Sequence, residues 1–249
     1  LVIERNGFPE HAWFTFCYSP LRISDDEVGG MFCTVTETTV HVLSERRNAF
    51  QLKLSDSLAS IADPAGVVTT AIRILGEEVN VSRVLFSEIN EVERTFLIRQ
   101  DWTQAGVSSI AGFYRQLDDF ESDIIVELSH GRAVLVDDVA KDPRLRHQAA
   151  TYSRAGIQAF IAIPLVKSGK LRIVLQLHQS QPYHWTEIDL QLAQDMAERS
   201  WSAVEHARAQ AELRAERDQS RHIFDSMTEG FAIVDADWRI LRINAAGLR

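Results

Sequence analysis

Two cysteines, Cys17 and Cys33, are the thiols of this chain, and both lie in its first 33 residues. A pair of cysteines does not form a disulfide framework, so we expect free thiols and a reducing, cytoplasmic compartment. A hairpin centred near residues 25–26 would bring the two cysteines close to opposite each other. A redox pair is therefore the alternative to two free, half-buried thiols.

Two histidines, His178 and His184, flank the end of a predicted strand and could share one side of it. A zinc site needs about four ligands, and no cysteine lies nearby, so these imidazoles make a poor zinc site. His178 is also the best candidate for an axial haem ligand, because it would project from a strand into an apolar region. A structural role is favoured for both, and we expect no metal site.

Two further patterns have simpler interpretations than the chemistry they suggest. His130 follows Leu128-Ser129, an order found at the phosphoacceptor of histidine kinases, but Gly131 ends the helix that such a site requires. We expect a histidine in a surface turn. The acidic group Asp137-Asp138 and Asp142 is interpreted as a solvated loop, with Asp142-Pro143 forming a turn and helix cap.

Catalytic motifs are absent from the sequence: it contains no GxxxxGK[ST], HExxH, GxSxG or CxxC. We therefore expect no catalytic residues in this chain and favour a module for binding and relay. A formal net charge of −9 argues against nucleic acid or an anionic membrane as a partner. No apolar run approaches the 18 residues that a transmembrane helix requires, so we expect no membrane span in this segment.

The longest predicted element is a helix over residues 186–227, which contain no proline or glycine. Thr186-Glu187 supplies an N-cap and an acid in the first turn, and the helix would be about 63 Å long. Its first half has an apolar face that can pack on a sheet, whereas residues 205–221 are highly charged. A thin apolar seam remains there: Ala207, Ala211 and Leu213. We expect a mechanical connector that pairs with a second copy in a parallel homodimer.

The other predicted elements are shorter and mix helices with antiparallel strands, which gives an α+β fold. Helices are expected at 43–62, 64–79, 121–129 and 144–154, and strands at 84–89, 95–102, 133–139, 158–166 and 171–178. Residues 108–120 are expected to be irregular. We expect further strands before and after these elements: two strands at 11–20 and 29–42, and a hairpin of 230–235 with 238–244.

Several stretches resemble known sensory domains. The resemblance to a GAF domain rests on DWTQAGVSSIAGFYRQLDDF, GRAVLVDDVAKDPRL and the run from IAIPLVKSGK to AVEHARA. The first 44 residues, with GGMFCTVTETT, resemble the last strands of a PAS domain, and SRHIFDSMTEGFAIVDADWRILRINAAG resembles the opening of another. The resemblance implies a GAF domain, an antiparallel sheet flanked by helices, between two partial PAS domains. Its implied divisions are 1–44, partial PAS; 45–62, connecting helix; 63–204, GAF; 205–222, helical linker; and 223–249, partial PAS.

PAS–GAF–PAS strings are similar to the input regions of bacterial sensor histidine kinases, of the HWE-like or hybrid type. The resemblance implies a signal-sensing and relay module of a two-component system, with C-terminal kinase domains and a response regulator as partners. The alternatives are a ligand-free structural dimerisation scaffold and the input region of a cyclic-di-GMP enzyme. A GAF-type sulfoxide reductase would need cysteines inside the GAF stretch, and that stretch has none.

A ligand pocket of the implied GAF domain would lie between the sheet and the segments 105–120 and 144–154. Its candidate wall residues are Phe113, Tyr114, Val136, Tyr152, Phe160 and His178. The alternative is that these side chains simply fill the core. The cofactor is unknown: the lysine pattern of nucleotide-binding GAF domains is missing, and a covalent bilin would lack its cysteine.

Overall fold

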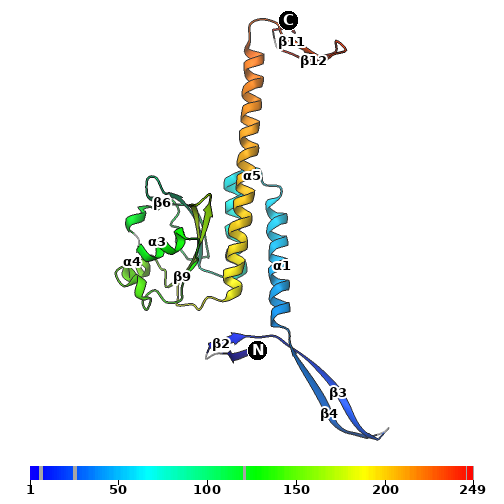
Figure 1. The fold of residues 1–249 in the computed structure, drawn as a ribbon, viewed down its shortest axis with the longest axis vertical. Coiled ribbons are helices and arrows are strands. Elements are labelled where there is room, and N and C mark those ends of the chain that lie inside the picture. Colours follow the sequence, from blue (N-terminus) through cyan, green and yellow to red (C-terminus); the bar gives the residue numbers. More distant parts are fainter. Residues whose placement is uncertain (6–7, 25–26, 120–121, 245, 249) are drawn as a thin grey trace.

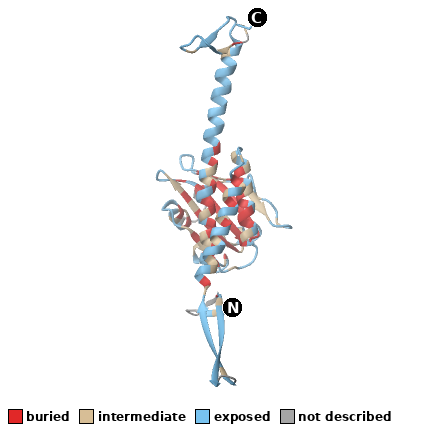
Figure 2. Ribbon diagram, turned by 90° about the vertical axis from the view of Figure 1, so that its right-hand side faces the viewer, coloured by how far each residue is buried: buried red, intermediate tan, exposed pale blue. Residues whose placement is uncertain are grey.

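The computed structural model describes residues 1–5, 8–24, 27–119, 122–244 and 246–248. The molecule is elongated, with a layered domain beside its middle and a β-hairpin at each end of the long axis (Figure 1). Burial is concentrated in the layered domain, whereas both end hairpins are largely exposed (Figure 2). The domain therefore holds the core, and the long helices connect it to the ends.

A six-stranded antiparallel sheet forms the centre of the domain. Its spatial order is β7 (Tyr114–Gln116), β6 (Thr95–Thr103), β5 (Arg83–Asn90), β10 (Lys170–Gln179), β9 (Ala159–Lys167) and β8 (Val134–Val136). The central strands are buried along most of their length because both faces of the sheet are covered. This explains why they appear in the sequence as nearly continuous apolar runs.

Helices cover both faces of this sheet. α2 (Pro64–Val79) and α5 (Glu187–Ser226) pack on one face, and α1 (Thr39–Leu58) packs on the outside of those two helices. α3 (Ser122–Ser129) and α4 (Ala149–Arg154) belong to the other face, with 3-10 turns at Leu117–Asp119 and Pro143–Leu145. The structure thus confirms the expected α+β arrangement of an antiparallel sheet with flanking helices.

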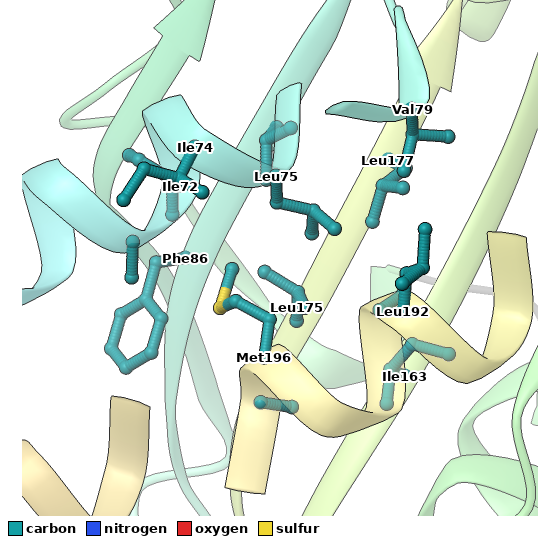
Figure 3. Close-up of a cluster of buried hydrophobic side chains, with 14 of the residues drawn as sticks. Ile72, Ile74, Leu75, Val79, Phe86, Ile163, Leu175, Leu177, Leu192 and Met196 are labelled. Carbon is teal, nitrogen blue, oxygen red and sulfur yellow. The ribbon is translucent and has the colours of Figure 1, made fainter. Parts of the chain in front are cut away.

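Two apolar clusters, one on each face of the sheet, stabilise these layers. On the face of α2 and α5, Met196 of α5 points toward Leu175 of β10 and Leu192 toward Leu177 of the same strand, with Leu75 of α2 above Leu175 (Figure 3). The second cluster includes Leu85, Phe96, Ile98 and Phe160 and lies under α3 and α4. Burial of such side chains is the main favourable term in the stability of the domain.

Capping residues at both ends set the bounds of α2 where the sequence predicts them. Asp63 caps the helix: its carboxylate accepts hydrogen bonds from the backbone N–H groups of Ala65, at 3.3 Å, and Gly66, at 2.9 Å. Pro64 occupies the first helical position, where a missing N–H has no consequence. Asn80 ends the helix in the left-handed conformation. The predicted bounds 64–79 are confirmed.

α5 is one uninterrupted helix of 40 residues that begins with a capping box. The Thr186 hydroxyl accepts a hydrogen bond from the Asp189 backbone N–H, and the Asp189 carboxylate accepts one from the Thr186 N–H. Buried positions run from Ile188 to Ala207, and beyond Ala207 the helix is exposed except at the half-buried Phe224. The prediction of a continuous helix over 186–227 is confirmed.

The N-terminal part forms two separate hairpins, β1 (Val2–Arg5) with β2 (Phe8–His11) and β3 (Phe14–Ser24) with β4 (Glu27–Glu37). Cys17 pairs with Thr34 and Cys33 pairs with Tyr18, so the two thiols point to opposite faces of the ribbon. Both cysteines are free and exposed. The expectation of half-buried thiols was wrong, and the pairing does not favour a redox pair. The predicted turn at 25–26 lies outside the described residues.

Several predicted bounds were also wrong. α1 begins at Thr39, inside the strand expected at 29–42. The Thr39 hydroxyl accepts a hydrogen bond from the Trp13 N–H and donates one to the Glu37 carboxylate, and these two bonds hold it at the start of the helix. The helix expected at 144–154 is divided into a 3-10 turn and α4. Asp142 caps the 3-10 turn, whereas α4 begins separately after Gln148, whose side chain forms no capping hydrogen bond. Of the strand expected at 133–139, only residues 134–136 form β8. The segment expected to be irregular contains the edge strand β7.

The C-terminal hairpin, β11 (Ala232–Val234) with β12 (Ile240–Ile243), agrees with the expected pairing. The guanidinium carbon of Arg242 lies 4.5 Å from the centre of the Phe224 ring, so β12 contacts the last turn of α5. In the part of the chain that the structure describes, no helix combines the length and apolar character needed to cross a bilayer.

Candidate functional site

A cavity of about 170 Å³ opens on the face of the sheet opposite α2 and α5. It lies between strands β5, β6 and β10 and the covering segments 110–119 and 148–157. Its lining is mainly apolar with a few polar side chains: Leu85, Phe96, Ile98, Ile110, Phe113, Arg115, Asp119, Gln148, Thr151, Tyr152, Ala155, Ile157, Gln176 and His178. This combination is typical of a small-molecule site.

Of the predicted wall residues, Phe113, Tyr152 and His178 line the cavity. Phe160 lies directly behind them: its ring stacks on Tyr152 at 5.4 Å and meets the edge of His178 at 6.2 Å. The structure therefore brings Tyr152, Phe160 and His178 together into one aromatic group, and Phe113 lies on the wall of the same cavity.

Two predicted wall residues lie elsewhere. Tyr114 is 56% exposed, because neighbouring side chains of an edge strand alternate between faces. Val136 is buried in the core without reaching the cavity.

The sequence reasoning missed the strand residues that form most of the floor. Leu85 of β5 is the registered partner of Gln176 on β10, and both line the cavity. Phe96 and Ile98 stand two residues apart on β6 and so share the same face. Alternation along β6 and β10 was the signal that could have identified these positions.

His178 forms the end of the floor and is 4% exposed. Its Nδ1 atom is buried and has no hydrogen-bond partner among the described residues. Burial lowers the pKa of the imidazole to about 3, with a smaller contribution from the nearby charge of Arg83. His178 is therefore an uncharged imidazole at neutral pH.

Arg83 is the registered partner of His178 and is 3% exposed. Its Nη2 atom donates to the carbonyl oxygen of Ser108 at 2.9 Å and, at 3.5 Å, to that of Ala155. Burial lowers the pKa of this guanidinium, and the charge of Asp101 partly opposes the shift. Arg83 thus ties the covering loop and the end of α4 to the sheet, a role that the sequence did not indicate.

The rim of the cavity carries charges of both signs. The guanidinium carbon of Arg115 lies 5.2 Å from the centre of the Phe113 ring. Asp119 lies on the same rim, and its backbone carbonyl accepts a hydrogen bond from Gln148 Nε2 at 2.8 Å. This bond joins the covering 3-10 turn to the start of α4.

The other candidate groups remain apart. His184 is exposed and its Nδ1 atom lies 2.6 Å from Asp137 Oδ2, so it shares no site with the buried His178. His130 lies in an exposed turn after α3, with its Nδ1 atom 2.7 Å from the carbonyl oxygen of Val126. The placement of His130 agrees with the turn predicted there.

The acidic group is divided among separate ion pairs. Asp138 pairs with Lys141 at 2.9 Å, and Asp142 pairs with Arg144 at 2.6 Å. Hydrogen bonds from these cations lower the pKa of each carboxyl. Within the described residues, no three potential metal ligands come together.

Comparison with known proteins identifies the fold around this cavity. A family model described as GAF domain matches residues 63–204. No curated protein sequence matches the chain.

Solved structures of low sequence identity share this fold. The phycoerythrobilin-bound GAF domain from a cyanobacterial phytochrome is 12% identical with a TM-score of 0.59, covering 66% of this chain and 97% of that one. A GAF domain of a Coxiella burnetii phosphoenolpyruvate-protein phosphotransferase is 14% identical with a TM-score of 0.56, covering 68% and 98%. Free methionine-R-sulfoxide reductase from Neisseria meningitidis is 16% identical with a TM-score of 0.53, covering 66% and 90%.

Proposed function

Because this chain belongs to the GAF domain family through residues 63–204, we propose that it senses a signal and relays it within a bacterial sensor histidine kinase. The state of a ligand or partner at the GAF domain alters the packing of α5. That change passes to C-terminal kinase domains, which act on a response regulator in the cytoplasm. Residues 1–44 and 223–249 are parts of two PAS domains in this proposal.

The observation that carries the proposal is the continuity of α5. Its first half is packed against α2, β9 and β10, and its last turn contacts β12 through Phe224 and Arg242. A helix transmits displacement because each backbone hydrogen bond couples neighbouring turns. A shift of the buried half therefore reaches the C-terminal hairpin.

The buried face of α5 is suited to small shifts. Ala193, Ala197 and Ser200 are buried there, and their short side chains interlock little with the neighbouring elements. Allosteric coupling is typically about 1–3 kcal/mol, which is comparable with repacking one or two such side chains.

A parallel homodimer through α5 is part of the proposal. Beyond Ala207 the helix leaves the domain, and Leu213 on it is 71% exposed. A solitary charged helix without tertiary contacts is marginally stable in water. Pairing with a second copy would cover the seam of Ala211 and Leu213.

The exposed hairpins support the assignment of partial PAS domains. A two-stranded sheet is marginally stable alone. The β3–β4 hairpin nevertheless exposes large apolar side chains on both faces: Phe16, Tyr18, Leu21, Ile23, Val28, Met31, Phe32 and Val35. Apolar patches of this kind favour packing against further protein.

Light scattering on the whole chain tests the dimer. We expect twice the monomer mass, and we expect Leu213→Glu to shift the equilibrium toward monomer by placing charges across the seam. Glu212→Gln, one position away, serves as the control. A dimer that survives Leu213→Glu would place the interface on another surface.

A thermal-shift screen against nucleotides, haem, flavin and bilin tests the sensing step. A sensor gains stability from a ligand that binds the folded state. A ligand-free dimerisation scaffold would keep the same Tm with every compound while remaining dimeric.

A further inference from the structure

We propose that the cavity binds a small planar ring compound bearing a carboxylate. Its ring lies between the apolar walls, and its carboxylate accepts a hydrogen bond from the imidazole of His178. This inference rests on the proposed sensing function and names the ligand class of that site.

The size and walls of the cavity select a small ring. Its volume is about 170 Å³, and an apolar cavity of about 150 Å³ in another protein holds benzene. Tyr152 and Phe113 line it from the covering segments, and Leu85 and Ile98 line it from the sheet. Aromatic side chains favour stacked or edge contacts with such a ring.

The floor of the cavity offers a polar side chain to a ligand. His178 Nδ1 is buried without a partner among the described residues, and His178 lines the cavity. A buried polar atom without a hydrogen bond is destabilising, and it regains stability when a ligand supplies one. Since the imidazole is uncharged, it can present an N–H to an acceptor.

The charge near the floor selects an anionic acceptor. Arg83 stands opposite His178, and among the described residues it donates hydrogen bonds to the backbone carbonyls of Ser108 and Ala155. The nearby Asp101 carboxylate accepts instead from Ser109 Oγ, at 2.8 Å, and Ile110 N, at 2.6 Å.

In the described part of the chain, Arg83 therefore forms no direct ion pair, and its Nε atom also lacks a partner. The positive charge of Arg83, which Asp101 only partly offsets, acts at His178 and favours a carboxylate oxygen over a cation there.

The rim does not reverse this preference. Arg115 and Asp119 both line the cavity and carry opposite charges, so this pair gives the rim no net charge. The floor, where Arg83 stands opposite His178, therefore decides the sign of the charge that the ligand carries.

The test compares three probes with one ring and different charges: benzoate, benzamide and benzamidine. Each is titrated into the whole chain by calorimetry, with the imidazole ¹⁵N signals of His178 followed by NMR. We expect saturable binding of benzoate that shifts the His178 signal, benzamide binding about tenfold weaker, and no benzamidine binding.

Substitutions locate the interaction. His178→Leu should weaken benzoate binding about tenfold or more, whereas His178→Gln, which keeps a donor, should retain part of it. His184→Gln, on the exposed histidine, is the matched control and should bind as the original chain does. If His178→Leu fails to fold, the ranking of the three probes and the ¹⁵N shift still decide the matter.

The proposal is overturned if benzoate does not bind saturably, if benzamidine binds as well as benzoate, or if His178→Leu leaves benzoate affinity unchanged. If benzamide binds more tightly than benzoate, the proposal of a carboxylate ligand is rejected, but the proposed sensing of a small molecule is not. A chain that responds to none of these rings and to no compound in the thermal-shift screen would reject both proposals.

Discussion

Arg47 of α1 and Asp195 of α5, 148 positions apart in the chain, form an ion pair through two hydrogen bonds of 2.6 and 2.7 Å. Gln51 Nε2 donates to the same carboxylate at 2.7 Å. Arg199 continues the series, with bonds of 3.1 Å to Gln51 Oε1 and 2.8 Å to Ser55 Oγ. This row of polar contacts fastens the helix that enters the domain to the helix that leaves it.

Asp195→Asn should loosen α1 from α5. The change removes the negative charge and leaves Arg47 and Arg199 without a carboxylate between them. We expect the free energy of unfolding to fall by about 1–2 kcal/mol, measured by urea denaturation. Hydrogen exchange should quicken in residues 44–58. Asp218→Asn, on the exposed part of α5, should change neither quantity.

The same carboxyl should contribute to acid sensitivity. The hydrogen bond from Arg47 lowers the pKa of Asp195 below its ordinary value of 3.8. Its stabilising contribution is therefore complete above the unfolded value and is lost as the pH falls through the lower, folded value. Asp195→Asn should flatten the decline of stability below pH 4. An unchanged acid limb would show that the pair is not stabilising.

Gly76→Ala should destabilise the contact between α2 and β6. A Cβ atom at Gly76 would lie 2.1 Å from the indole ring of Trp102, so the ring or the helix must move. We expect a loss of about 2 kcal/mol in the free energy of unfolding. Trp102→Leu in the same chain should recover much of this loss, as a double-mutant cycle would show. Additive effects would contradict the steric explanation.

Stability should depend on His178 in mildly acidic solution. The unfolded chain takes up a proton on this residue near pH 6.5, whereas the folded chain does so only near the depressed pKa of about 3. Stability should therefore fall as the pH drops from 6.5 toward 3, by up to about 1.4 kcal/mol per unit. Urea denaturation at pH 5, 6 and 7.5 should show a shallower slope for His178→Leu. Equal slopes would mean that the imidazole is not buried uncharged.

Thr186→Ala should weaken the start of α5. It removes the hydroxyl that accepts from the Asp189 N–H at 3.3 Å and donates to the Asp189 carboxylate at 2.7 Å. We expect a loss of about 1 kcal/mol in the free energy of unfolding, measured by thermal denaturation. Thr186→Ser keeps the hydroxyl and should behave like the original chain. A loss of equal size in both variants would assign the effect to the methyl group.

Local signals predicted α2 and α5, because Asp63-Pro64 and Thr186 mark helix starts through contacts within a few residues. The start of α1 was missed because its β-branched residues favour a strand, and a bond from Trp13, distant in the chain, holds Thr39 at the helix start. Strand β7 has only three residues, which is too short for a hydrophobic period to be recognised, whereas the strand containing β8 was predicted but drawn too long.

Aromatic bulk indicated Phe113, Tyr152 and His178 as wall residues. Arg83 was missed because an arginine at the start of a strand is usually exposed. It is buried here only because two distant loops supply the carbonyl groups of Ser108 and Ala155. Such pairing depends on the tertiary fold and leaves no local pattern in the sequence.

The part of α5 beyond Ala207 projects clear of the layered domain toward β11 and β12 (Figure 1). It acts as a lever arm with its fulcrum at the domain surface. At 1.5 Å per residue this arm is about 28 Å long, so a tilt of about 5° at its base would displace its tip by roughly 2–3 Å. A rearrangement too small to disturb the core would thus arrive at the far end magnified to the size of a side-chain contact.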